Sequence, residues 1–183
     1  GEQVVDAPGS LVVSGYAPVP NITRKVTPDF KKSGNDIVFI DLSSGMYRMG
    51  GSALSHIFKQ IGDNVPDFED APKLIKTFKI IQEFINDGKI VSGHDRSDGG
   101  LITTILEMCI SSGKGCKLNI NSDVNPIEYM FAEELGIVVE IDSISKLYAV
   151  DIPCNIKLLG HVTDDNRVDI IYNEMNMLQE DVN

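Results

Sequence analysis

The chain has 183 residues, of which 42% are hydrophobic and 23% are charged, a balance typical of one globular domain. Its formal net charge of −11 opposes a phosphate backbone, so the sequence predicts no nucleic-acid partner for the domain as a whole. No apolar run approaches the roughly 20 residues that cross a membrane, and the first residues lack the pattern of a targeting segment. Three scattered cysteines, Cys109, Cys116 and Cys154, favour reduced thiols in a cytoplasmic protein over a disulfide framework or a zinc site.

The N-terminal third alternates apolar runs with turn-forming residues. Residues 11–17 predict a strand that ends at Pro18, and the polar residues 21–35 predict a connector. The β-branched run at 36–42 predicts a short buried strand. After the turn at 50–52, five apolar residues predict a helix that buries one face: Ala53, Leu54, Ile57, Phe58 and Ile61.

The strongest helix signal lies at 72–87. Asp70 is suited to cap this helix, Pro72 is suited to its first turn, and Gly88 is suited to its end. Six apolar residues form its predicted buried face: Leu74, Ile75, Phe78, Ile81, Phe84 and Ile85.

The remaining residues predict a mixture of strands and helices. The predicted strands are 89–92, 116–120, 137–141, 155–161 and 167–172, and the predicted helices start near 100 and at 126, the second running to about 134. Because these elements do not alternate strictly, the predicted fold class is α+β, a mixed β-sheet with helices packed on its faces. The charged tail at 173–183 has little to bury, and we expect it to fray.

The densest functional signal lies between a predicted strand and a predicted helix. It consists of His94, Asp95, Arg96, Ser97, Asp98, Gly99 and Gly100. Backbone amides at the start of a helix can bind an anion, and the two glycines let a phosphate approach the backbone. Asp95 offers a carboxylate to Mg²⁺, and the Ser97 hydroxyl can bond to a nucleotide. On spacing alone, an equally good interpretation is structural: a helix cap followed by a tight turn.

A second glycine turn precedes the helix predicted from Ala53. Gly50, Gly51 and Ser52 follow Arg48 and could form another anion-facing helix end. Ordinary loop chemistry instead favours a turn that continues into a helix cap.

Several other polar residues could take part in chemistry. Glu133 and Glu134 could act as acid–base groups or Mg²⁺ ligands, although a solvated helix face is the favoured interpretation. His94 either positions a phosphate or the neighbouring Asp95, or is simply structural, and His161 receives no assignment. No cysteine has a histidine near it in the sequence, so nucleophilic catalysis has no support. No residue of this chain is assigned a catalytic role.

Five runs of the chain resemble the large-type phosphoribosylformylglycinamidine synthase family, in that family's order and spacing. They are residues 7–14 (APGSLVVS), 27–29 (TPD), 48–54 (RMGGSAL), 94–101 (HDRSDGGL) and 131–136 (FAEELG). Enzymes of that family contain two copies of a module shared with aminoimidazole ribonucleotide synthetase, followed by a glutaminase domain. The resemblance implies that residues 21–183 are the C-terminal half of the second copy and that residues 1–20 end the preceding ATP-type half. One departure is Ala132, where the family usually has asparagine, and it weakens the case for a site at Glu133.

The resemblance also implies a reaction and a binding role. In that reaction ATP activates the amide oxygen of formylglycinamide ribonucleotide, and ammonia from glutamine then displaces phosphate. Asp95 is implied to bind Mg²⁺ and Ser97 to contact ATP or ADP, while Asp98, Gly99 and Gly100 shape the loop. The implied partners are the ATP-type and glutaminase domains of the same parent chain, and the isolated chain is expected to be inactive.

Two alternatives to this hypothesis are a free-standing phosphate-binding or scaffolding module, and the homologous half of a cyclo-ligase or a selenophosphate synthetase. A longer gene that also encodes the ATP-type and glutaminase domains would argue against the first. The second ranks lower because those relatives carry a different loop where this chain has residues 94–100. If the chain works inside a larger enzyme, we expect its docking faces to expose a sizeable apolar patch.

Overall fold

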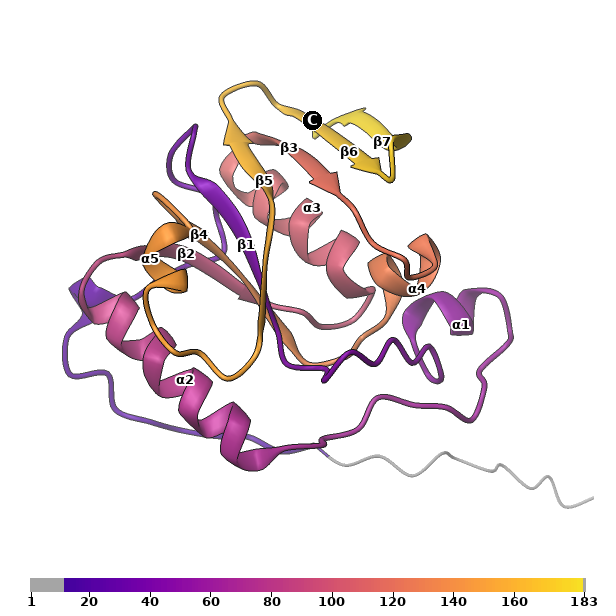
Figure 1. Cartoon of the computed structure of the whole chain (residues 1–183), viewed down its shortest axis with the longest axis horizontal. Helices are drawn as coiled ribbons and strands as arrows, with labels where there is room; N and C mark the ends of the chain where they lie inside the picture. The colour runs from indigo at the N-terminus through magenta and orange to yellow at the C-terminus, as the bar shows by residue number, and fades with distance from the viewer. Residues whose placement is uncertain (1–11, 183) are drawn as a thin grey trace, which may run out of the picture.

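A computed structural model describes residues 12–182, and its centre is one seven-stranded sheet in the order β2-β4-β1-β5-β3-β6-β7 (Figure 1). The strands are β1 Asp36–Asp41, β2 Ile90–Asp95, β3 Gly115–Ile120, β4 Gly136–Ile141, β5 Asn155–Thr163, β6 Arg167–Tyr172 and β7 Met175–Asp181. Strands β3 and β6 pair in parallel, and the other neighbouring strands pair antiparallel. The sheet is therefore mixed, as the sequence predicts.

Five α-helices and one short 3₁₀ helix accompany the sheet in the described part of the chain. They are the 3₁₀ helix Ile22–Arg24 and the α-helices α1 Ala53–Ile57, α2 Ala71–Asn86, α3 Gly100–Ser112, α4 Pro126–Phe131 and α5 Ser145–Tyr148. The predicted α+β class is confirmed. Among residues 12–182, no helix combines the length and apolar character that a membrane crossing needs.

Helices cover both faces of the central strand β1, which explains its continuous apolar sequence. Ile37 and Phe39 pack into the cluster that contains α3, whereas Val38 and Ile40 pack into the cluster that contains α2. Successive side chains of a strand point to opposite faces, so α2 and α3 lie on opposite sides of the sheet. The loops at the ends of these strands are thereby held on a rigid layer.

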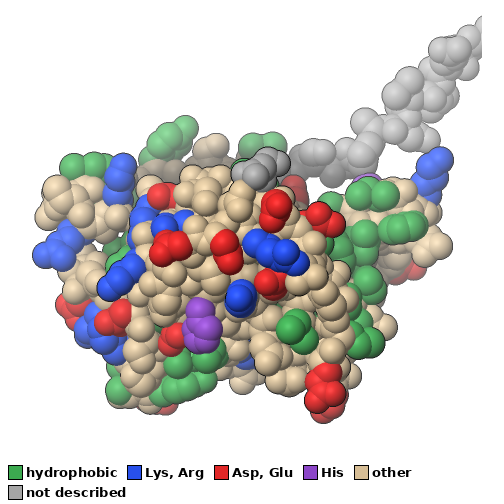
Figure 2. Space-filling model, turned by 90° about the horizontal axis from the view of Figure 1, so that it is seen from above, with side chains coloured by type: hydrophobic (Ala, Val, Ile, Leu, Met, Phe, Trp, Pro, Cys, Tyr) green, Lys and Arg blue, Asp and Glu red, His purple; other side chains and the backbone are tan. Residues whose placement is uncertain are grey.

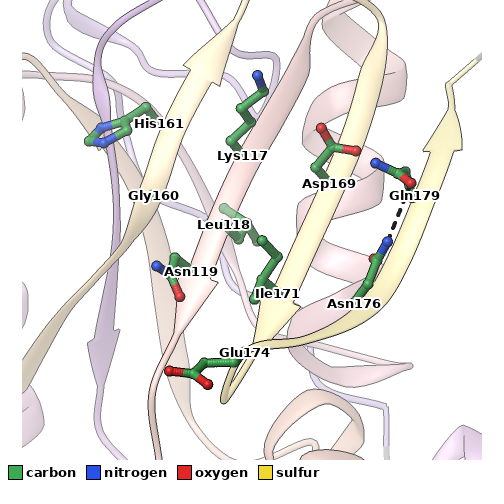
Figure 3. A pocket seen from close by; sticks show the side chains of 10 residues that line it. All are labelled: Lys117, Leu118, Asn119, Gly160, His161, Asp169, Ile171, Glu174, Asn176 and Gln179. Carbon is green, nitrogen blue, oxygen red and sulfur yellow. Dashed lines mark hydrogen bonds between the residues drawn. The ribbon is translucent and has the colours of Figure 1, made fainter.

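The α2 side of the sheet is open beyond β5. Lys117 and Asn119 of β3 are exposed there, whereas their neighbours Cys116 and Leu118 are buried on the α3 side. Figure 3 shows this open face, with a hollow of about 450 Å³ lined by side chains of β3, β5, β6 and the β6–β7 hairpin.

Some local predictions are wrong. Leu11 lies outside the described residues, and residues 12–17 form no strand, since Val12 and Val13 are 88% and 81% exposed and have no sheet partner in the described chain. Helix α1 is shorter than predicted and leaves Phe58, just beyond its end, exposed. The tail does not fray, because Met175–Asp181 pairs with β6.

Candidate functional site

The predicted nucleotide loop lies between the end of β2 and the start of α3. Asp95 is the last residue of β2, and its side chain is 79% exposed. Ser97 and Asp98 follow as exposed residues, and α3 begins at Gly100. The loop therefore presents one carboxylate, one hydroxyl and a second carboxylate to solvent, at the end of a rigid strand.

Arg96 points the opposite way and anchors this loop. Its buried guanidinium donates to the backbone carbonyls of Glu134 and Leu135 and lies 4.9 Å from the centre of the Phe39 ring. Its backbone amide donates to the Gly136 carbonyl at 2.8 Å. Burial lowers the pKa of Arg96. The Arg96 Nε, Nη2 and backbone amide are thus bonded to β4 and the segment before it, whereas the buried Nη1 has no hydrogen-bond partner among the described residues.

The glycine amides of this loop are not free, which corrects the predicted backbone anion site. The Gly99 amide donates to Glu133 Oε1 at 2.7 Å, and the Gly100 amide donates to the Ser97 carbonyl at 3.0 Å. Both glycines have a positive φ, of 84° and 74°, which explains why glycine occupies these positions. The chain's own carboxylate thus lies where the sequence predicts a phosphate.

The second glycine turn is structural in the same way. The Gly50 and Gly51 amides donate to the carbonyls of Asn64 and Ile61, each at 2.8 Å. Ser52 is fully buried, and its hydroxyl accepts a bond from the Ser55 amide as the N-cap of α1. The interpretation of these residues as an anion-facing helix end for a nucleotide is therefore not supported, and the turn-and-cap interpretation fits the geometry.

Glu133 and Glu134 do not form a solvated helix face. Helix α4 ends at Phe131, so both acids lie in the link to β4. Glu133 Oε1 accepts bonds from the amides of Gly99 and Ala53, at 2.7 Å and 2.8 Å. Glu134 is fully buried and pairs with Arg48 Nε at 2.6 Å. The sequence singled out these two acids, but their roles as acceptors of backbone amides and of Arg48 were missed.

Two of the three histidines lie beside acidic side chains. His94 Nδ1 lies 2.7 Å from the Asp95 carbonyl oxygen and 3.4 Å from Asp95 Oδ1, and its Nε2 lies 3.1 Å from Glu107 Oε2. Of the interpretations left open, the geometry favours a histidine that positions Asp95 rather than a phosphate. His161, which received no assignment, lies with its Nδ1 3.1 Å from Asp36 Oδ1.

Asp95 borders two adjacent apolar hollows between α2 and strands β2 and β4. Their volumes are about 270 Å³ and 480 Å³, and Phe78 and Ile137 line both. Phe78 and Ile75 were predicted to be buried but are 52% and 56% exposed. Among residues 12–182, no three histidine, cysteine or acidic side chains gather in a way that could hold a metal ion.

Further apolar side chains are exposed around α1 and the loop that follows it. A hollow of about 510 Å³ lies between α1 and α4 and is lined by Met49, Leu54, Ser55, Phe58, Gln60, Ile127 and Phe131. On the face shown in Figure 2, acidic and basic side chains are interspersed, and hydrophobic side chains gather toward its margins.

The chain is similar to known proteins at three levels. The family model described as "AIR synthase related protein, C-terminal domain" matches residues 32–173. The "Probable phosphoribosylformylglycinamidine synthase, chloroplastic/mitochondrial" of Arabidopsis thaliana is 41% identical over 187 residues, covering 97% of this chain and 13% of the relative. The phosphoribosylformylglycinamidine synthase of Dictyostelium discoideum is 44% identical over 161 residues (82% and 12%), and that of Homo sapiens is 41% identical over 144 residues (77% and 11%). The chain thus spans little more than a tenth of the length of these relatives.

Solved structures share the fold. "T. maritima PurL complexed with FGAR" gives a TM-score of 0.71 at 13% identity, covering 88% of this chain and 29% of that one. "T. maritima PurL complexed with ATP" gives 0.66 at 14% identity, covering 88% and 27%. A hydrogenase maturation protein, HypE of E. coli, gives 0.54 at 15% identity, covering 87% and 52%. At these identities the likeness shows the fold alone.

Proposed function

Because this chain belongs to the family of AIR synthase related C-terminal domains, we propose that it works as one domain of a phosphoribosylformylglycinamidine synthase. The parent enzyme would use ATP and glutamine-derived ammonia to aminate formylglycinamide ribonucleotide in purine synthesis. Residues 21–183 form the domain in this proposal, and residues 1–20 end the ATP-type half before it. The names of the relatives that match 77–97% of this chain support the assignment.

Within that enzyme, the role of this domain is to supply the loop at 95–100 to a nucleotide–Mg²⁺ site. The observation that carries this proposal is the outward-facing Asp95 carboxylate, 79% exposed at the end of β2 and fixed by the buried Arg96 that follows it. Solved T. maritima PurL structures with ATP, ADP and AMPPCP are consistent with a nucleotide ligand for proteins of this fold.

The chemistry of the loop is suited to a hard cation. The exposed Asp95 supplies carboxylate oxygens, the ligands that Mg²⁺ prefers, and Asp98 adds a second exposed acid to the same loop. Arg48 is buried and paired with Glu134, and Arg96 is buried with its Nε and Nη2 bonded to backbone carbonyls. A polyphosphate that approaches these acids needs a cation to bridge the like charges, and Asp95 is placed to hold it. The nucleotide phosphates, water and the neighbouring domain supply the remaining ligands in this proposal.

The exposed apolar side chains fit a domain that packs against others. Phe58, Ile61, Ile75 and Phe78 would be covered by the ATP-type or glutaminase domains of the parent chain. Whether the protein is cytoplasmic, as the sequence predicts, stays a prediction, since the name of the A. thaliana relative places that protein in chloroplasts or mitochondria.

Titration calorimetry of Mg·ADP on the intact parent enzyme tests the proposal. We expect Asp95→Asn to weaken binding by about tenfold or more in the presence of Mg²⁺, because the amide loses the charge that holds the metal. Asp123→Asn, which alters an exposed aspartate before α4, serves as the matched control. Unchanged affinity in Asp95→Asn would remove the metal assignment.

The isolated chain provides a second test. It is expected to show neither amination nor glutaminase turnover, because no residue in it is assigned a catalytic role. Glutamate release by the purified chain would contradict this expectation.

A further inference from the structure

Glu133 joins two loops that lie far apart in the sequence. Its Oε1 accepts one hydrogen bond from the amide of Ala53, the first residue of α1, and one from the amide of Gly99, just before α3. The two distances, 2.8 Å and 2.7 Å, are those of good charge-assisted bonds. A single carboxylate oxygen therefore holds the turn at 50–53 against the loop that carries Asp95.

The rest of the loop is anchored on the same stretch of chain. Arg96 bonds to the carbonyls just beyond Glu133, at Glu134 and Leu135. At the other end, a Cβ added to Gly100 would lie 2.7 Å from backbone atoms of Phe131 and Met130. The loop is thus fixed before and after its exposed residues, and the Glu133 carboxylate also reaches the start of α1.

We infer that Glu133 is a positioning residue: by bonding the Ala53 and Gly99 amides together, it fixes where the loop presents Asp95 and Ser97 to a nucleotide. This inference rests on the proposed function. A carboxylate is suited to the task because amides at helix starts carry partial positive charge. Since Glu133 occupies the Gly99 amide, a nucleotide phosphate meets this loop through side chains and a metal ion.

Hydrogen exchange of the chain, followed by NMR, tests the coupling of the two loops. In Glu133→Ala, the Ala53 and Gly99 amides are expected to exchange faster together, by about tenfold or more, because both lose their acceptor. Glu133→Gln retains a side-chain oxygen and is expected to restore much of the protection. If only one amide, or neither, responds to Glu133→Ala, the coupling is disproved.

A matched control is available in Glu140, a buried carboxylate that binds another loop. Glu140 accepts bonds from the amides of Lys31 and Lys32, at 2.7 Å and 2.9 Å. Glu140→Gln weakens the same kind of contact at the 31–35 loop. It is expected to lower thermal stability without changing exchange at Ala53 or Gly99.

Mg·ADP titration of the intact parent enzyme then separates positioning from general stability. We expect Glu133→Ala to weaken binding by about tenfold, Glu133→Gln to recover most of the loss, and Glu140→Gln to stay within about twofold of the parent enzyme. Unchanged affinity of Glu133→Ala for Mg·ADP would overturn the inference. Faster exchange of the Gly99 amide on adding Mg·ADP would also overturn it, because it would show that the ligand displaces the Glu133 carboxylate. If the unaltered enzyme binds no Mg·ADP, the proposed function fails, and the exchange experiment still decides whether Glu133 couples the loops.

Discussion

Arg48 and Glu134 form a buried bidentate ion pair. Arg48 Nε lies 2.6 Å from Glu134 Oε1, Arg48 Nη2 lies 2.9 Å from Oε2, and the Arg48 backbone amide also donates to Oε1 at 3.0 Å. The hydrogen bonds that the Arg48 guanidinium donates to Glu134, and next the contact with Glu69, raise the pKa of Arg48 above its usual value. The pair fastens the segment that leads into the glycine turn at 50–53 to the link before β4.

Breaking this pair should destabilise the fold. We expect Arg48→Met to lower Tm by roughly 10 °C, because it leaves a buried carboxylate with one backbone donor. Glu134→Gln should cost less, since the new amide oxygen still accepts the Arg48 backbone bond. Scanning calorimetry measures both, with Lys76→Met as the control, since it breaks the exposed pair of Lys76 with Asp151. An Arg48→Met variant as stable as the control would contradict the account.

The best predicted elements are those whose signals are local. Helix α2 was predicted at 72–87 and lies at Ala71–Asn86, with Asp70 Oδ1 accepting the Lys73 amide at 3.0 Å. The capping residue, the proline of the first turn and the spacing of the apolar residues all act within a few residues of one another. The local sequence alone therefore specifies this helix. The β6–β7 hairpin was missed, although Asn173 was a usable signal: it and Glu174 adopt positive φ in a two-residue turn.

The site was harder to predict because its contacts are long-range. The loop at 94–100 does join a strand to a helix, as predicted, but the availability of its amides depends on Glu133, 34 residues from Gly99. Glu134 and Arg48 are 86 residues apart, and neither shows a local pattern that names its partner. At Val12 and Val13 the local pattern misled in the opposite direction. These β-branched residues suggested a strand, but they have no sheet partner in the described chain.

Gly100 should tolerate no side chain. Its φ is +74°, and an added Cβ would lie 2.7 Å from the Met130 carbonyl oxygen and from backbone atoms of Phe131. We expect Gly100→Ala to lower the free energy of unfolding by more than about 3 kcal/mol, because backbone rather than a flexible side chain must move.

Gly113→Ala is the matched control for this clash. Gly113 has a similar φ of +65°, but nothing lies within 4 Å of its added Cβ. Gly113→Ala should lower the free energy of unfolding by about 1 kcal/mol, from backbone strain alone. Urea unfolding of both variants tests the difference, and equal losses would show that the contact with α4 is not tight.

Cys116 should make stability fall at alkaline pH. The hydrogen bond with Cys109, together with burial, raises the pKa of the Cys116 thiol. Because the folded-state pKa is higher than the unfolded value of about 8.5, the unfolded chain loses the proton first as pH rises. The contribution of the Cys116 thiol to the free energy of unfolding is therefore fully present below about pH 8.5. Above that pH it declines, by up to about 1.4 kcal/mol per pH unit.

Urea unfolding at a series of pH values measures this effect. Cys116→Ala removes the thiol, so its free energy of unfolding should fall less steeply above about pH 8.5 than that of the unaltered chain. Identical slopes for the two proteins would show that Cys116 does not contribute. The comparison also separates Cys116 from Cys154, whose pKa is raised by burial and which both proteins retain.

The apolar surface around α1 and α2 should make the isolated chain self-associate. Phe58 is 66% exposed beside the hollow between α1 and α4, and Phe78 is 52% exposed beside the two hollows near Asp95. Large exposed aromatic side chains next to apolar hollows are typical of surfaces that a partner covers.

We expect sedimentation velocity to show association of the chain that increases with concentration, and Phe58→Asp or Phe78→Asp to reduce this association. Tyr148→Asp, which alters a 61% exposed aromatic residue on α5, should leave association unchanged. A chain that stays monomeric at all concentrations would argue that these side chains are not docking surfaces.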